Sequence, residues 1–196
     1  HRAATAGADT DASKSYTLAA NQSVLLDDIV GALGLSGLAS IDILPSTGVR
    51  PAAVVRVFND AGLNGTSGLT EPVLPQSAFL QAGVTAVLIT QPSTKEARFN
   101  VGVRTGPAGA VIDVVTRNSA GTFVKSVRKT YAQNWFEQTT GDAFAGQALD
   151  PSSVITLTVV SGSAVVYGST TDNTTQDPSL QLAARLPLGP PVLDRE

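Results

Sequence analysis

The side chains that catalyse acid–base and nucleophilic reactions are nearly absent from this sequence. The chain has one histidine, His1, and contains neither cysteine nor methionine. A Ser-His-Asp triad, thiolate nucleophiles, disulfides and cysteine-based zinc clusters are therefore excluded. An N-terminal histidine chelates copper through its amine and ring, but such sites need a second histidine that this chain lacks. We interpret His1 as a processing site or as the edge of a fragment of a longer precursor.

One loop near the C-terminus is rich in oxygen ligands. It contains Asp172, Asn173 and Asp177, and Ca²⁺ prefers carboxylate and carbonyl ligands. The spacing differs from that of a helix–loop–helix calcium site. The preferred interpretation is that these side chains hydrogen-bond the backbone of their own turn. We therefore expect no cofactor, with Ca²⁺ at this loop as the alternative.

The clustered aromatic residues are Tyr131, Trp135 and Phe136. If they are exposed, they form a platform on which a carbohydrate ring can stack. If they are buried, they close one end of a hydrophobic core, and this is the preferred interpretation. The position of these three side chains therefore decides whether they are a candidate ligand site.

Carboxylates remain as possible catalytic groups. Asp27 and Asp28 are adjacent, so on a helix they point about 100° apart and cannot easily share a ligand. No other spacing indicates two acids facing each other across a cleft, as a glycosidase requires. Arg98, Asn100 and Arg104 share one face of a predicted strand, which a solvent-facing sheet explains. We expect the protein not to be an enzyme.

The composition indicates an all-β extracellular domain. Charged residues make up 15% of the chain and aromatic residues 5%, with 18 glycines and 11 prolines, whereas average soluble domains have roughly 25% charged residues. The net charge of −3 is spread along the chain without a basic stripe, so we expect no nucleic-acid partner. No apolar run reaches the roughly 18 residues of a membrane span.

Strand patterns dominate the chain, and we predict an antiparallel β-sandwich with one or two short helices. The helices are predicted over 25–34, where Gly34 is a suitable C-terminal cap, and just after Asn134. Residues 61–76 are predicted to form a long loop, and Gly121 a hairpin connection after Asn118. The predicted strands are 15–18, 23–26, 39–44, 53–58, 84–90, 98–104, 110–116, 122–129, 154–160 and 165–169.

The sequence contains an internal two-fold repeat, with one copy over about 14–80 and another over about 97–186. Residues 14–21 match 128–134, and the strand pair 39–44 and 53–59 matches 154–160 and 164–169. A predicted hairpin, 98–105 and 110–116, precedes these segments in the second copy and has no counterpart in the first. Flanking this sandwich domain (14–186) we place an N-terminal extension (1–13) and a Pro-rich tail (187–196).

A sandwich without this hairpin has an open sheet edge and an uncovered apolar face, which are unfavourable in water. We therefore expect the missing strands to come from another polypeptide segment: a nicked N-terminal piece, a neighbouring subunit or a symmetry mate. The interface is predicted to include Arg2, Ala4, Tyr16, Leu188 and Val192.

Three segments resemble a family of uncharacterised bacterial secreted β-sandwich modules, found as repeats or C-terminal domains of large extracellular proteins. They are 16–30, the strand 98–103, and the closing segment 167–178. The sequence departs from the family pattern at Phe99 and Gln176, where the pattern has Thr and Gly. The resemblance implies a β-sandwich and a secreted location, and it implies no catalytic residues.

These observations predict a non-enzymatic, extracellular structural or adhesive module of a bacterial surface, such as a filament subunit. Its expected partner is protein, through self-association or the missing N-terminal segment. The alternative is a carbohydrate-binding module of a secreted protein, with polysaccharide as its partner.

Overall fold

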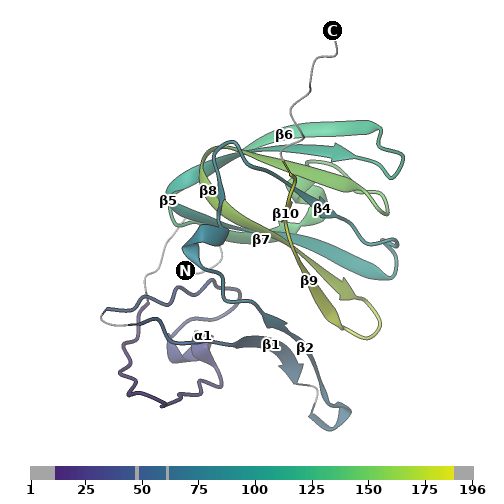
Figure 1. Ribbon diagram of the computed structural model, residues 1–196. Helices are drawn as coiled ribbons and strands as arrows, with labels where there is room; N and C mark the ends of the chain where they lie inside the picture. The colour runs from purple at the N-terminus through teal and green to yellow at the C-terminus, as the bar shows by residue number, and fades with distance from the viewer. Residues whose placement is uncertain (1–11, 47–48, 61, 188–196) are drawn as a thin grey trace.

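The structure is a computed structural model that describes residues 12–46, 49–60 and 62–187 (Figure 1). It confirms the predicted all-β antiparallel fold with two short α-helices. Among the described residues, no helix is long and apolar enough to cross a membrane. The elements in chain order are α1 (Ile29–Ala32), β1 (Val55–Asp60), η1 (Gly62–Asn64), β2 (Thr66–Glu71), η2 (Gln76–Ala78), β3 (Leu80–Gln81), β4 (Thr85–Ile89), β5 (Ala97–Arg117), β6 (Phe123–Tyr131), β7 (Phe136–Thr140), α2 (Gly141–Ala145), β8 (Val154–Asp172), β9 (Pro178–Leu182) and β10 (Ala184–Arg185).

Two long strands, β5 and β8, organise the sandwich. They pair antiparallel from Ala97↔Asp172 to Arg117↔Val154, with irregularities in register after Thr105 and after Val111. The first half of β5 also pairs with β7, and its second half pairs with β6. Along β8, the first half pairs with β4 and the second half with β9. Both long strands therefore belong to two groups of strands. One group contains β7 and β9, the other contains β4 and β6, and the irregular part of β5 and β8 lies between the two groups.

A single hydrophobic core joins the two groups. It includes Val101 and Val103 from the first half of β5, and Ile112 and Val114 from its second half. The alternation of buried and exposed residues along β5 and β8 follows from the two-residue period of a strand. Phe144 of α2 is fully buried in the same core.

The predicted hairpin over 98–105 and 110–116 is wrong, because these residues form one continuous strand. The Gly106-Pro107-Ala108-Gly109 segment has the composition of a reversing turn, yet β5 only bends there. The neighbouring strand β8 has its own irregularity there: Gly162, opposite Ala110, has a positive φ, and the pairing with β5 skips Val160. Two adjacent strands thus bend together and stay paired, which local turn composition does not reveal.

Several predictions for the N-terminal half are also wrong. Residues 15–18 and 23–26 form no strand, and 39–44 contains only an isolated bridge at Ala39. Conversely, the predicted loop 61–76 contains β2, which forms because β1 pairs with it from Val55↔Glu71 to Asp60↔Thr66.

The two predicted helices are shorter or displaced. The helix predicted over 25–34 is reduced to α1; the Asp28 carboxylate caps its N-terminus by accepting from Gly31 N–H, and Gly34 follows its end with a positive φ of 69°. The turn predicted after Asn134 is strand β7 instead, and helix α2 follows it. The Pro-rich tail from 188 onward lies outside the described residues.

Candidate functional site

The N-terminal half of the chain lacks a core of its own. Of the described residues between 12 and 79, none is buried, and the first buried residue is Leu80. Fifteen of the 21 large hydrophobic residues found exposed lie in this half, including Leu25 at 85%, Leu44 at 84% and Val54 at 84%. Exposed apolar residues in such number make this half a candidate interaction surface.

The β1–β2 hairpin contains the only strands of this half within the described residues, and Figure 1 shows it extending beside the sandwich. No described strand other than β2 pairs with β1. Alternate N–H and C=O groups of β1 therefore point away from its partner, as at any sheet edge. On this strand Val57 and Phe58 are half exposed, and the Arg56 guanidinium lies 5.5 Å from the centre of the Phe58 ring.

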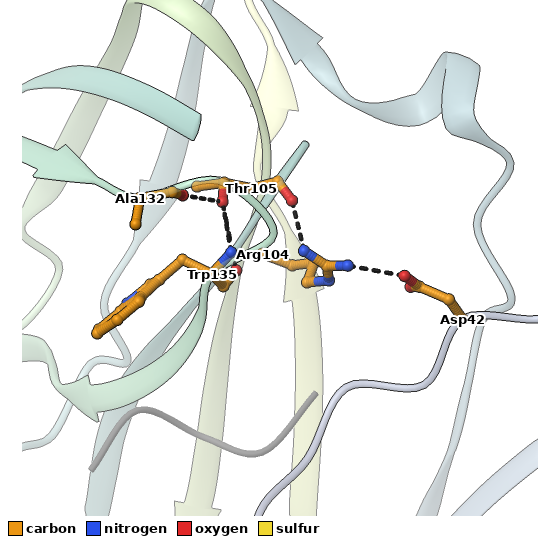
Figure 2. Close-up of polar contacts among 5 residues, drawn as sticks. All are labelled: Asp42, Arg104, Thr105, Ala132 and Trp135. Atoms are coloured by element: carbon orange, nitrogen blue, oxygen red, sulfur yellow. Dashed lines mark hydrogen bonds and ion pairs between the residues drawn. The ribbon is translucent and has the colours of Figure 1, made fainter. Parts of the chain in front are cut away.

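An ion pair ties residues 39–44 to the sandwich (Figure 2). Arg104 of β5 donates from Nη2 to Asp42 Oδ2 at 2.7 Å and from Nη1 to the Thr105 carbonyl oxygen. The Arg104 side chain is 11% exposed and the Asp42 side chain 42%. The guanidinium is thus largely withdrawn from water, and Asp42 supplies an opposite charge from the N-terminal half.

Thr105 connects Arg104 to the turn between β6 and β7. This fully buried residue donates from Oγ1 to the Ala132 carbonyl oxygen at 2.7 Å and accepts from Trp135 N–H at 2.8 Å, as Figure 2 shows. The Thr105 hydroxyl thus provides a hydrogen-bond partner for both backbone groups of the turn. These bonds fix the position of Thr105 on β5, and therefore also that of Arg104, the residue before it.

Strand β2, which ends at Glu71, lies against strand β9 of the sandwich. Burial raises the pKa of the Glu71 carboxyl. The Tyr167 hydroxyl of β8 donates to Gln138 Oε1 at 2.7 Å. Burial raises the pKa of Tyr167, and the negative charge of Glu71 raises it further. A carboxylate of β2 thus acts electrostatically on a phenol of β8.

An open groove of about 420 Å³ separates the β1–β2 hairpin from the turn between β8 and β9. The Arg98 guanidinium reaches the turn, donating to Asn173 Oδ1 at 3.3 Å and to Gln176 Oε1 at 2.9 Å. The half-exposed ring of Phe58 contributes the groove's aromatic surface. The lining residues are Val57, Phe58, Asn59, Ser67, Gly68, Arg98, Thr171, Gln176 and Pro178.

The aromatic residues considered as a stacking platform lie in the core or against it. Tyr131 is 8% exposed and Phe136 is 6% exposed, and Trp135 packs partly buried against the core. Burial, followed by the charge of Glu137, raises the pKa of the Tyr131 hydroxyl. These side chains close the core and do not offer an exposed face for a sugar ring.

The oxygen-rich loop hydrogen-bonds itself. The Asp172 carboxylate accepts from the N–H groups of Thr174 and Thr175, both at 2.7 Å, and these bonds lower its pKa. Asn173 accepts from Arg98, and Asp177 N–H donates to Thr175 Oγ1. Among the described residues there is no group of three or more His, Cys, Asp and Glu side chains that could hold a metal ion.

Of the five residues predicted for the interface, the structure describes Tyr16. Tyr16 is 44% exposed, with Lys14 Nζ 5.7 Å from its ring centre. Arg2, Ala4, Leu188 and Val192 lie outside the described residues. The sequence reasoning missed the Arg104–Asp42 pair and the position of Glu71 near Tyr167. The sequence does offer one signal for a role of Asp42, because it is an acidic residue between two isoleucines, Ile41 and Ile43.

Comparison with known proteins provides no relative for this chain: no family model matches it, and no curated protein or solved structure is significantly similar to it.

Proposed function

We propose that this protein is a non-enzymatic structural or adhesive module of a bacterial cell surface or extracellular assembly, completed by strands from another polypeptide segment. The observation that carries the proposal is the absence of any buried residue among the described residues of 12–79, together with the exposed hydrophobic residues there. An apolar surface of this kind is stable in water when a partner covers it.

The contacts between the halves also support this function. The Arg104–Asp42 ion pair and the packing of β2 against β9 hold the N-terminal half against the sandwich at two places. Neither contact involves the edge of β1 that faces away from β2, and no described strand pairs with that edge. Strand addition at such an edge gives affinity through main-chain hydrogen bonds.

The test is the mass of the native particle, measured by light scattering, with mass spectrometry of every polypeptide in it. We expect a large assembly or a co-purifying polypeptide. A stable monomer of about the 20.0 kDa chain mass, well folded at high concentration, would contradict the proposal.

A second candidate function is carbohydrate binding, which the groove between the β1–β2 hairpin and the β8–β9 turn favours. Phe58 offers a half-exposed ring, and Arg98 and Gln176 offer polar groups beside it. Aromatic surface with a few convergent polar groups is the usual character of a ligand site. Glycan-array binding by the wild type that is lost in Phe58→Ala, and kept in Phe123→Ala on β6, would support it. No binding to any glycan would exclude it.

A further inference from the structure

The groove between the β1–β2 hairpin and the β8–β9 turn is lined by more hydrogen-bonding side chains than apolar ones. The hydrogen-bonding residues of its lining are Asn59, Ser67, Arg98, Thr171 and Gln176, beside Val57, Phe58, Gly68 and Pro178. Its volume of about 420 Å³ lies within the roughly 300–1,000 Å³ that is usual for small-molecule sites. The groove therefore suits a segment of a flexible, polar chain better than a folded domain.

The aromatic surface of this groove is the ring of Phe58. This residue pairs with Gly68 across the β1–β2 hairpin, and it is 50% exposed. A Cβ on Gly68 would lie only 2.6 Å from the Cα and Cβ atoms of Phe58, so the close approach of the two strands requires glycine. The residue directly opposite Phe58 thus has no side chain to cover its ring. A sugar ring can stack on an exposed apolar surface of this kind.

Arg98 brings positive charge to the groove. Among the described residues that line it, Arg98 is the one with a charged side chain, and it is exposed. Its guanidinium donates to two neutral amide oxygens, Gln176 Oε1 at 2.9 Å and Asn173 Oδ1 at 3.3 Å. Within the described part of the chain it forms no ion pair with a carboxylate. Since a guanidinium has five N–H groups, donors and an unneutralised charge remain for a ligand.

A second cation lies next to the groove. The Arg56 guanidinium is 5.5 Å from the centre of the Phe58 ring, and it donates to the neutral Thr66 Oγ1 at 3.4 Å. The two acids of the nearby turn, Asp172 and Asp177, do not line the groove, and the Asp172 carboxylate accepts from two N–H groups of its own turn. The charged groups at the groove are thus positive, and charge complementarity favours an anionic ligand.

Gln176 orients Arg98 from an unfavourable backbone conformation. Its φ of 60° lies in the left-handed region, which disfavours every residue with a Cβ. Its side chain accepts from Arg98 Nη2 and donates from Nε2 to the Asn173 carbonyl oxygen at 2.8 Å. Glycine would suit this backbone better, whereas glutamine holds the guanidinium beside the groove. Gln176 is therefore a positioning residue for Arg98.

We propose that this groove binds a polysaccharide whose sugar rings carry carboxylate groups, that is, a chain of uronic acids. This inference rests on the second candidate function, carbohydrate binding, and names its ligand. Arg98 binds the carboxylate, because guanidinium and carboxylate form strong charge-assisted hydrogen bonds. Phe58 stacks against a sugar ring, and the neutral polar side chains bind its hydroxyl groups. An acidic peptide has the same charge, but it offers few hydroxyl groups to this lining.

The test is calorimetric titration of the full chain with tetramers of galacturonate, glucuronate and mannuronate, each compared with its methyl ester. The ester keeps the sugar ring and its hydroxyl groups and removes the charge. We expect at least one uronate to bind about tenfold more tightly than its ester, because charge-assisted hydrogen bonds are roughly twice as strong as neutral ones. This preference should weaken as the salt concentration rises.

Equal binding of every uronate and its ester would overturn the inference while leaving carbohydrate binding at the groove intact. Absence of binding to all of them would overturn the inference, and the glycan array then decides separately whether the groove binds neutral sugars. An oligoglutamate peptide that binds as tightly as the best uronate would assign the groove to acidic polypeptides, which also overturns the inference.

Matched variants separate the role of Arg98 from general charge. Arg98→Gln should lose the preference for uronate over ester. Arg117→Gln, at the other end of β5, should keep it, since the Arg117 guanidinium donates to the Gly121 carbonyl oxygen. Gln176→Gly removes the positioning amide and suits the left-handed backbone, so it should fold as well as the wild type and bind the uronate about fivefold more weakly. A preference that persists in Arg98→Gln, or wild-type affinity in Gln176→Gly, would contradict the inference.

Discussion

Gly162 of β8 faces the carbonyl oxygen of Gly109 of β5, at the place where the two long strands bend together. Both glycines have the same left-handed backbone, with φ of 71°. A Cβ on Gly162 would collide with the Gly109 carbonyl group. The close approach of two backbones at this bend therefore requires glycine, for both conformation and space.

The first prediction concerns this bend. Gly162→Ala should destabilise the protein by about 3 kcal/mol, because a backbone collision adds to the cost of a left-handed non-glycine residue. The measurement is the free energy of unfolding in urea. The control is Gly121→Ala, at φ of 79° with no atom within 4 Å of the added Cβ, for which we expect about 1 kcal/mol. Equal losses for the two variants would show that the bend is not tightly packed.

The second prediction separates a bonded buried hydroxyl from an unbonded one. Thr105→Val should cost about 1–3 kcal/mol, because it leaves the Ala132 carbonyl and the Trp135 N–H without their partner. Thr116→Val should be neutral or stabilising, because the buried Thr116 Oγ1 has no hydrogen-bond partner among the described residues. Both are measured by thermal unfolding, and a comparable loss in each would contradict the assignment.

The third prediction concerns the Arg104–Asp42 ion pair. Asp42→Ala should lower the free energy of unfolding in urea by about 1 kcal/mol, because a largely buried guanidinium loses its charged partner. The control Asp113→Ala removes the exposed pair between β5 and β6, in which Arg128 donates to Asp113 Oδ1 at 2.6 Å. We expect no measurable change there, since exposed pairs contribute little. An unchanged free energy of unfolding on loss of Asp42 would contradict the anchoring role.

The fourth prediction is a pH dependence at Glu71. Its folded-state pKa lies above the ordinary value of 4.5, because burial disfavours the charged form. The folded protein therefore binds more protons than the unfolded chain, so this contribution to stability is present at low pH and is lost as pH rises through the raised pKa. We expect β1–β2 amide protection, corrected for intrinsic exchange, to fall as pH rises from 4.5.

Glu71→Gln should remove this dependence, and Glu96→Gln, at an exposed loop glutamate, should keep it. The effect should stay below about 1 kcal/mol, because Glu71 is partly exposed and water screens its charge. A pH dependence that survives in Glu71→Gln would assign it to another group.

Local sequence signals predicted much of the C-terminal half correctly. The alternating pattern predicted the residues of β4, β6 and both halves of β8. The connection after Asn118 is confirmed: Gly121 has φ of 79°, and its N–H donates to the Asn118 carbonyl oxygen at 2.9 Å. The preferred burial of Tyr131 and the self-bonded Asp172 turn also agree with the structure. These features depend on neighbours within a few residues or on hydrophobicity alone.

The sequence by itself determined that this chain is an antiparallel β protein and which residues have strand patterns. Only the tertiary structure decided that β5 and β8 continue through their glycine bends, because continued pairing there depends on residues far apart in the chain, such as Ala110 and Gly162, which are 52 positions apart. It also decided that 39–44 has only a bridge at Ala39 in place of the predicted strand, since a strand forms only where a neighbouring strand pairs along its length. The meeting of Arg104 with Asp42 was likewise a tertiary outcome, because residues 62 positions apart are brought together by packing and register rather than by local pattern.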